Sequence, residues 1–307
     1  MKIYQNLRII GVDHGYGNMK TANCCFPTGV LMSEIEPSFG GDVLVWNGRY
    51  HQIGAGHKAF AAEKLLDEDY YVLTLAAIAR ELGREKVCEA DVFLAAGLPL
   101  TWVGQQKDAF KKYLLQNETV EFTFRRKDYH IRVVGADLYP QGFAAIVNNL
   151  ADFSGVNMLC DIGNGTMNVM FVANKKPDPL HCFTEKFGTH QCMLQVRENL
   201  LKEHGIEPLE DSITQVFRFG TADMDAAYLK TITDTAREYT VGIFHRLQEH
   251  GYDQRMMKLY VVGGGGALIK NFAEYDPSRV TINDDICATA KGYERMAEMK
   301  LLRGDKL

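Results

Sequence analysis

Residues 13–20 read DHGYGNMK and residues 161–166 read DIGNGT, and these two stretches decide the fold of this 307-residue chain. Each follows an apolar run that is typical of a buried strand, at residues 7–12 and 156–160. Both have the pattern Asp-x-Gly-x-Gly, and their aspartates, Asp13 and Asp161, are 148 positions apart (161 minus 13). A pattern repeated over that distance predicts a duplicated domain.

A third glycine turn joins this pair. Residues 263–266 are four consecutive glycines, and they follow a strand-like run at 259–262. Without side chains in the way, the backbone amides of such turns can wrap phosphate oxygens. Either Asp-x-Gly-x-Gly copy alone also fits a hairpin turn, and a glycine run alone also fits a loop beside a tightly packed helix. Three such turns after three strands predict a nucleotide-binding protein.

The two aspartates predict a magnesium ion at this site. Two carboxylates and a triphosphate repel one another unless a cation lies between them, and Mg²⁺ is typically held by one or two carboxylates with phosphates and water. We therefore expect Asp13 and Asp161 to hold Mg²⁺, through water, with Lys20 adding positive charge near the phosphates. The marks of other nucleotide folds are missing. The sequence has no G-x-x-x-x-G-K-[ST], and no G-x-G-x-x-G after the first strand with an acidic residue about 20 positions on.

Composition and charge are those of an ordinary globular protein, with 46% hydrophobic and 24% charged residues. A net charge of -5 argues against a protein that coats DNA by charge, although a local basic patch is compatible with it. The seven cysteines include no C-x-x-C pair, and no signal peptide is recognised. We expect free thiols in the cytoplasm and no membrane helix, because no apolar run reaches about 18 residues.

Strands and helices alternate along the chain, which predicts an α/β architecture with largely parallel sheets. The Asn47-Gly48 pair predicts a two-residue hairpin turn, and the basic tip at 125–127 is expected to be a solvated turn rather than a phosphate contact. Predicted strands lie at 7–12, 43–46, 49–53, 90–98, 156–160 and 259–262, with a second hairpin at 120–134. Predicted helices lie at 59–84 (with a break near Asp69), 142–153, 189–204, 222–250 and 285–302.

These turns, in this order, resemble the phosphate loops and adenosine motif of the actin, heat-shock ATPase and sugar kinase superfamily. That resemblance implies duplicated actin-like (ribonuclease H-like) domains with a nucleotide cleft between them. It implies one domain at 1–153 plus 285–307, with an outer subdomain at about 31–80, and another at 154–284, with an outer subdomain at about 181–255. Residues 141–149 and 288–296 resemble the two hinge helices, where small residues at Gly142, Ala145, Ala288 and Gly292 would allow close approach.

Within the superfamily the chain is most similar to the bacterial ParM/StbA plasmid-segregation group. The similarity lies in the first loop with Tyr16 and Asn18, the hairpin around Trp46, the Leu98-Pro99-Leu100 element and residues 287–293. Tyr16 stands where actin has a serine, so only its backbone is expected to contact phosphate. Gly188, before a helix, is a candidate for ribose and base contacts, and a plain loop-to-helix junction is the alternative. The expected ATP- or GTP-binding residues are Asp13, Gly15, Tyr16, Gly17, Asn18, Lys20, Asp161, Gly163, Asn164, Gly165, Thr166, Gly188, Gly263, Gly264, Gly265 and Gly266.

Hydrolysis needs a polar group aimed at the attacking water. In actin-like proteins that group lies at the start of the first hinge helix, which here implies Gln141. Glutamine is a poor base but can orient a water, as it does in GTPases. The alternative is that Gln141 only caps the helix. We expect His14 to be a solvent-facing turn residue rather than a catalyst.

The resemblance implies a cytoplasmic, nucleotide-dependent ATPase or GTPase that forms homopolymer filaments and segregates or positions DNA. An adaptor protein on a centromere-like site would contact the DNA, and the chain itself would contact neither DNA nor membrane. Two alternatives share the fold: a small-molecule kinase and a non-polymerising scaffold switched by ATP. Fold alone does not separate them.

Overall fold

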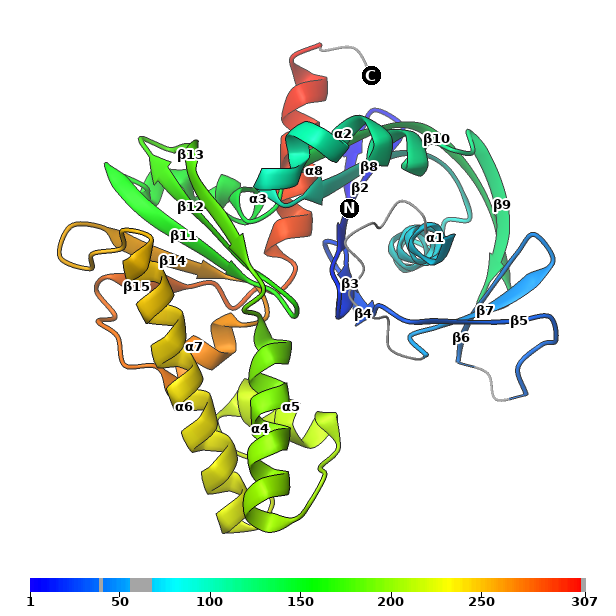
Figure 1. Ribbon diagram of the computed structural model, residues 1–307. Helices are drawn as coiled ribbons and strands as arrows, with labels where there is room; N and C mark the ends of the chain where they lie inside the picture. The colour runs from blue at the N-terminus through cyan, green and yellow to red at the C-terminus, as the bar shows by residue number, and fades with distance from the viewer. Residues whose placement is uncertain (39–40, 56–67, 305–307) are drawn as a thin grey trace. The chain divides into compact units, whose positions relative to one another are not determined.

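A computed structural model describes residues 1–38, 41–55 and 68–304. The chain divides into two compact units, Met1–Asn148 with Cys287–Leu307 and Asn149–Ile286 (Figure 1). Each unit has its own sheet and its own hydrophobic core. The outer subdomains expected at about 31–80 and 181–255 stay predictions.

The first unit is a strongly curved sheet around one helix. The strand order is β4-β3-β2-β8-β10-β9-β6-β7-β5, and β1 pairs with β2. Its elements are β1 (Lys2–Tyr4), β2 (Leu7–His14), β3 (Asn18–Lys20), β4 (Cys25–Pro27), β5 (Val30–Ser33), β6 (Asp42–Trp46), β7 (Arg49–Ile53), α1 (Glu68–Arg84), β8 (Glu89–Leu98), α2 (Leu100–Leu114), β9 (Thr119–Phe124), β10 (Lys127–Pro140), α3 (Phe143–Ile146) and α8 (Ala288–Leu302).

Helix α1 lies inside that curve and contacts β2, β3, β6 and β7 (Figure 1). Its residues 70–79 are all buried, because a helix that is apolar on every side needs protein around it. Helix α8 packs on the other face of β2, where a Cβ on Gly11 would lie 2.1 Å from the Ala290 carbonyl oxygen. A Cβ on Gly292 would lie 1.8 Å from the Ala144 oxygen, so the close approach of α3 and α8 expected from small residues is confirmed.

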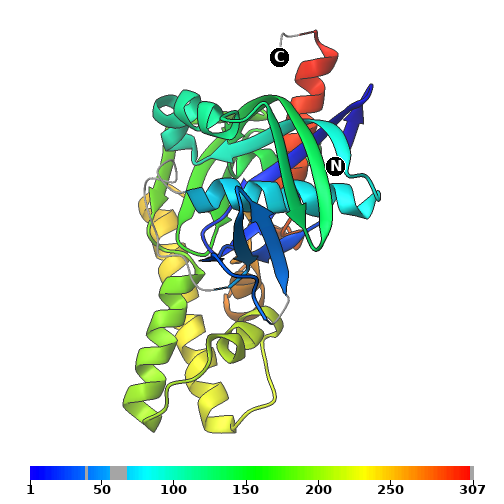
Figure 2. The same cartoon turned by 90° about the vertical axis from the view of Figure 1, so that its right-hand side faces the viewer.

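The second unit places a helix pair and two shorter helices with a five-stranded sheet. Its strand order is β13-β12-β11-β14-β15. Helices α4 and α6 lie side by side in both views (Figures 1 and 2). The elements are β11 (Val156–Ile162), β12 (Met167–Ala173), β13 (Lys176–Glu185), α4 (Thr189–His204), α5 (Glu210–Phe219), α6 (Ala226–Glu249), β14 (Lys258–Val262), α7 (Gly266–Phe272) and β15 (Val280–Ile282).

The two sheets share the same order of antiparallel and parallel strand pairs, so the predicted duplication is confirmed. The series β4-β3-β2-β8-β10 and β13-β12-β11-β14-β15 each contain two antiparallel pairs followed by two parallel pairs. The register also matches at the glycine turns. Asp13 lies opposite Lys20, and Asp161 lies opposite Asn168, seven positions on in both cases.

The expectation of largely parallel sheets is wrong. Among the described strands, nine of the thirteen pairs are antiparallel. The reason is that tight turns join many neighbouring strands directly. Asn47 and Gly48 have positive φ, as the predicted hairpin turn requires. Arg125 and Arg126 also have positive φ, at the turn of the second hairpin. Residues 125–128 are all exposed, so the expected solvated turn is confirmed; Arg125 also pairs with Asp42 of β6.

Most predicted elements are present with shifted ends. The helix expected at 189–204 matches α4, which ends at Gly205 with φ 68°. The helix expected at 222–250 begins later, because Asp225 caps α6 by accepting from the Ala227 and Tyr228 amides. The helix expected at 142–153 is only α3 followed by a 3₁₀ helix, Val147–Asp152. The part of the 59–84 helix before Glu68 lies outside the described residues. From Glu68 to Arg84 α1 matches the prediction, but it continues through Asp69, where a break was expected. Helices α2, α5 and α7 were not predicted.

Candidate functional site

Three side chains predicted for the site meet in the first unit. Asp13 is the penultimate residue of β2 and is buried. Its Oδ2 lies 3.2 Å from the Nζ of Lys20, its partner across the β2–β3 pair. Its Oδ1 accepts a hydrogen bond from Nε2 of Gln141, also at 3.2 Å, at the end of β10. A carboxylate, a cation and an amide, brought together from three segments, form a polar group at the carboxyl end of parallel strands.

The first glycine turn is tight, and Thr28 stabilises it with two hydrogen bonds. The Gly15 amide donates to the Asp13 carbonyl at 3.0 Å, and a Cβ on Gly15 would lie only 2.4 Å from the Asn18 oxygen. The Thr28 hydroxyl donates to the Gly15 carbonyl at 2.8 Å, and its amide donates to the Gly17 carbonyl at 3.0 Å. The turn therefore requires glycine at position 15. This role of Thr28 was not predicted, because no local sequence pattern indicates it.

Tyr16 and Asn18 are half-buried residues of this turn. Burial raises the pKa of the Tyr16 phenol to about 12, so the hydroxyl keeps its proton at neutral pH. The tyrosine thus adds no charge next to Asp13.

The expectation that His14 faces solvent is wrong. His14 is fully buried, its Nε2 lies 2.9 Å from the Thr74 hydroxyl, and its ring meets Phe110 edge-on with centroids 5.2 Å apart. The cause is that β2 continues two residues beyond the predicted strand, so alternation directs His14 to the α1 side of the sheet and Asp13 to the other side. His14 is part of the core beneath the turn.

The side chain of Gln141 bonds to Asp13 rather than to a helix end. The N-cap residue of α3 is Gly142, which makes no side-chain cap bond. The Gln141 backbone amide donates to the Leu98 carbonyl at 2.8 Å, which anchors the residue beside β8. The geometry therefore speaks against the helix-cap alternative.

In the second unit, the glycine run at 263–266 packs against the end of β11. Asp161 lies opposite Val262 in the parallel β11–β14 pair, so the residues that follow each strand are neighbours. Gly263 has φ 86°, and a Cβ there would lie 2.5 Å from Oδ1 of Asp161. Gly265 donates from its amide to the Ile162 carbonyl at 2.9 Å, and its Cβ would clash with the Ile162 side chain at 2.2 Å. A Cβ on Gly264 would meet no atom within 4 Å.

Gly188 and the start of α4 support the turn at 163–166. The Gly163 amide closes this turn on the Thr166 carbonyl at 2.8 Å. A Cβ on Gly188 would lie 2.3 Å from the Asn164 oxygen, and the Thr189 amide donates to the Gly163 carbonyl at 3.1 Å. The second unit thus brings together Asp161, Gly163, Asn164, Gly165, Thr166, Gly188, Gly263, Gly264, Gly265 and Gly266.

The residues fit a magnesium ion that is held mainly by its ligand and water. Within the described ranges there is no group of three or more His, Cys, Asp or Glu side chains that could form a protein cage for a metal. One carboxylate lies beside a glycine turn in each unit, Asp13 in the first and Asp161 in the second. Magnesium typically takes one or two carboxylates and completes its shell with phosphates and water.

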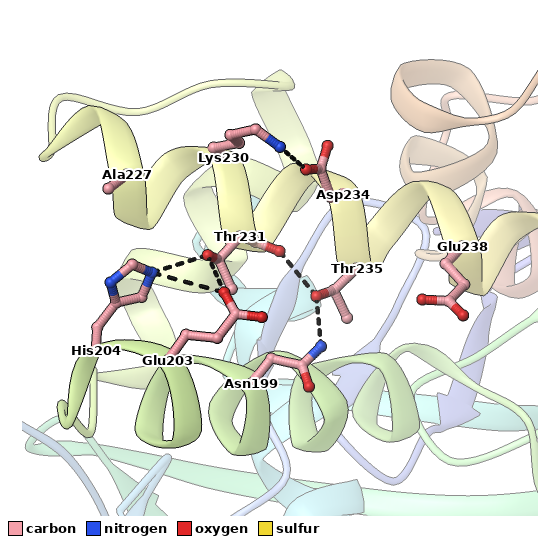
Figure 3. Close-up of a pocket in the computed structure, with 9 residues that line it drawn as sticks. All are labelled: Asn199, Glu203, His204, Ala227, Lys230, Thr231, Asp234, Thr235 and Glu238. Atoms are coloured by element: carbon pink, nitrogen blue, oxygen red, sulfur yellow. Dashed lines mark hydrogen bonds and ion pairs between the residues drawn. The ribbon is translucent and has the colours of Figure 1, made fainter.

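A cavity of about 390 Å³ lies elsewhere in the second unit, between α4 and α6 (Figure 3). There Thr231 donates to Glu203 at 2.8 Å, and Asn199 donates to the Thr235 hydroxyl at 2.9 Å. None of the residues predicted for the nucleotide site lines this cavity. Along the three described stretches of the chain, no helix has the length and apolar character of a membrane span.

Comparisons with solved structures give one consistent fold. An archaeal actin homologue in complex with ADP superposes with a TM-score of 0.73 at 19% identity, over 95% of this chain and 99% of that one. ParM of Bacillus thuringiensis with ATP gives 0.71 at 14% identity, over 97% and 100%. The filament structure of Alp12 gives 0.67 at 16% identity, also over 97% and 100%. At these identities the likeness establishes the actin fold.

Sequence comparison adds the family. No curated protein matches the chain. A family model for the N-terminal domain of actin-like proteins matches residues 11–143, which include Asp13, Lys20 and Gln141. A model for the C-terminal part of archaeal, MreB-like actin homologues matches residues 159–274, which include Asp161 and the 263–266 run. With one such model on each unit, the predicted resemblance is confirmed and the chain belongs to the family of actin-like proteins.

Proposed function

We propose that this protein binds ATP or GTP with Mg²⁺, hydrolyses it, and assembles into filaments that segregate or position DNA, as a member of the ParM/StbA group. The observation that carries the proposal is the polar group at Asp13. A carboxylate held by both Lys20 and Gln141, next to a turn that needs glycine at position 15, suits a phosphate and its metal. The same turn recurs at Asp161 with the same register.

Nucleotide binding is assigned to the glycine turns. The amides of Gly15 and Gly163 close their own turns, so the backbone amides of 16–18 and 164–166 bind phosphate oxygens, and Lys20 compensates their charge. Asp13 and Asp161 are the residues that would hold Mg²⁺, through water. When bound, the ion neutralises charge on the phosphate oxygens. Residues 263–266 serve the adenosine end, where the open side of Gly264 leaves space. Two similar structures, one in complex with ADP and one with ATP, support this assignment.

Water activation is assigned to Gln141. Its Nε2 donates to Asp13, so the other amide atom, Oε1, is an acceptor whose orientation is fixed. An acceptor held in place orients a water for attack without removing a proton outright. Asp13 therefore does two things: it holds the metal's water and it positions the glutamine.

Filament formation is supported by the likeness to the Alp12 filament and to ParM. Identical head-to-tail contacts that do not close a ring produce an open filament. DNA contact is assigned to an adaptor protein on a centromere-like site, because a net charge of -5 does not favour direct binding.

Electron microscopy of the purified chain tests this function. Filaments are expected with Mg²⁺ and ATP or GTP, and none with EDTA in place of Mg²⁺. Phosphate release measured in the same samples is expected to follow assembly. Particles that stay monomeric under all conditions, with phosphate transferred to a small metabolite, would overturn the proposal in favour of a kinase. Nucleotide binding without polymer or turnover would instead indicate a switched scaffold.

A further inference from the structure

Gly188 has both of its backbone polar groups engaged by side chains. Its amide donates to Oε1 of Gln191 at 2.8 Å, and its carbonyl accepts from the Tyr239 hydroxyl at 2.7 Å. Tyr239 comes from α6, 51 positions away, and is only 2% exposed. Burial raises the pKa of its phenol, so it stays a hydrogen-bond donor. These two hydrogen bonds fix the position of the Gly188 backbone.

The segment before Gly188 is tied to α6 at two further points. The Phe187 ring stacks on Tyr239, with centroids 4.2 Å apart and planes 11° from parallel. The Arg246 guanidinium lies over the Phe187 ring at 3.7 Å and pairs with Glu185 at 3.0 Å. An ion pair, a ring stack and a hydrogen bond therefore hold residues 185–188 against one face of α6.

This support controls which way the peptides of the phosphate turn face. The Thr189 amide donates to the Gly163 carbonyl at 3.1 Å, and the His190 amide donates to the Asn164 carbonyl at 2.9 Å. In a trans peptide the C=O and the following N–H point in opposite directions. With both carbonyls drawn to the start of α4, the N–H groups of Asn164 and Gly165 face away from it, as anion binding needs.

We infer that Tyr239 is a positioning residue for the 163–166 turn, and that Gly188 supports this turn rather than contacting the nucleotide. The inference rests on the proposed function, in which the turn binds phosphate. Tyr239 acts through Gly188 and the first amides of α4. Loss of its hydroxyl frees the Gly188 carbonyl, so the two peptides lose their fixed orientation.

Tyr239→Phe tests the inference, since it removes one hydroxyl and keeps the ring stack. We expect the Kd for Mg²⁺–ADP, measured by calorimetry, to rise about 2- to 10-fold, the effect of one hydrogen bond. In turnover assays KM should rise while kcat stays unchanged. Hydrogen exchange without nucleotide should speed up at residues 163–166. The matched control is Tyr252→Phe, because Tyr252 is a buried tyrosine of the same unit outside this segment.

The outcomes separate this inference from the proposed function. A folded Tyr239→Phe variant with unchanged Kd and unchanged exchange overturns the inference and leaves the function standing. A parent protein that binds no nucleotide overturns the function, while the exchange measurement still decides whether Tyr239 orders the turn. If Tyr239→Phe does not fold, Gln191→Ala removes the other anchor from a partly exposed site and is expected to raise the same Kd.

Discussion

Nε2 of Gln141 lies 3.2 Å from Oδ1 of Asp13, although 128 positions separate the two residues. The contact joins the end of β10 to the end of β2, two strands on either side of β8. It holds the glutamine at the only carboxylate of the first glycine turn. Gln141, which is expected to orient the attacking water, and Asp13, which is expected to hold the metal's water, are therefore joined by a hydrogen bond.

Gln141→Ala should slow phosphate release by about 10- to 1000-fold, the scale of one positioned catalytic contact. Nucleotide binding should persist, because the turns and Lys20 are unchanged. A phosphate-release assay at saturating nucleotide, with calorimetry for binding, gives both values. The control is Gln116→Ala, at an exposed position of the same unit. Turnover at the parent rate would mean that another residue orients the water.

Asp161→Asn should weaken Mg²⁺–nucleotide binding by about 1.5–3 kcal/mol, roughly 10- to 150-fold, as the loss of a charged partner does. The loss should be smaller in EDTA, because the carboxylate acts through the metal. Calorimetry with and without Mg²⁺ measures the difference. Asp223→Asn, at an exposed position of the same unit, should change neither value. Equal loss with and without metal would remove Asp161 from the magnesium site.

Gly263→Ala and Gly205→Ala form a matched pair. Both glycines have positive φ, 86° and 68°, so the backbone conformation alone should cost alanine about 1–2 kcal/mol of folding stability at each. The cost at Gly263 should be larger, because a Cβ there also lies 2.7 Å from the Ile162 carbonyl oxygen. A Cβ at Gly205 meets nothing within 4 Å, whereas one at Gly263 lies 2.5 Å from the Asp161 carboxylate. Only Gly263→Ala should therefore also displace Asp161 and weaken nucleotide binding. Thermal melts and binding titrations on both variants separate strain from steric effect, and equal affinities would refute the placement.

The sequence predicted those parts of the site that depend on local patterns. Asp13 and Asp161 each follow an apolar strand and precede alternating glycines, and both are where that pattern puts them. The end of α4 was also predictable, because Gly205 is a C-cap signal and has the left-handed conformation that signal implies. Such features need only a few neighbouring residues.

Features that depend on distant partners were not predictable. His14 is buried because β2 runs on through the start of the turn and α1 supplies Thr74 opposite it. The bond from Tyr239 to Gly188 has no local mark, since any buried tyrosine on α6 would look the same in sequence. Gln191 is the exception: a glutamine three residues after a candidate N-cap is a recognised capping pattern.

Glu294 should make stability depend on pH. This residue of α8 is 3% exposed and accepts from the Gly11 amide at 3.1 Å, and burial raises its pKa from 4.5 to about 7. The folded state therefore keeps a proton that the unfolded chain releases. The resulting stability, on the order of 3 kcal/mol, is complete below pH 4.5 and is lost as pH rises to about 7.

Glu294→Gln should abolish this dependence, because a neutral amide mimics the protonated acid at every pH. Urea unfolding at pH 5 and pH 8 should show a smaller loss for the variant than for the parent. Glu298→Gln, on the same helix, is the control: interaction with Lys2 lowers the pKa of Glu298, so its own contribution changes below this window. An identical loss in parent and Glu294→Gln would show that Glu294 is ionised throughout.

The lifetime of the filament should follow the hydrolysis rate. A ligand that binds one conformation better than another shifts the population toward it, so bound nucleotide can favour the subunit form that assembles. Light scattering should rise above a critical protein concentration when Mg²⁺ and ATP or GTP are added, and should decay as the nucleotide is consumed. Gln141→Ala should lengthen the plateau by about the factor by which it slows phosphate release, because binding is intact and only turnover is lost.

A non-hydrolysable analogue should hold the plateau in the parent, and Gln116→Ala should behave as the parent does. A plateau of equal length in Gln141→Ala, together with slowed phosphate release, would show that disassembly does not depend on hydrolysis.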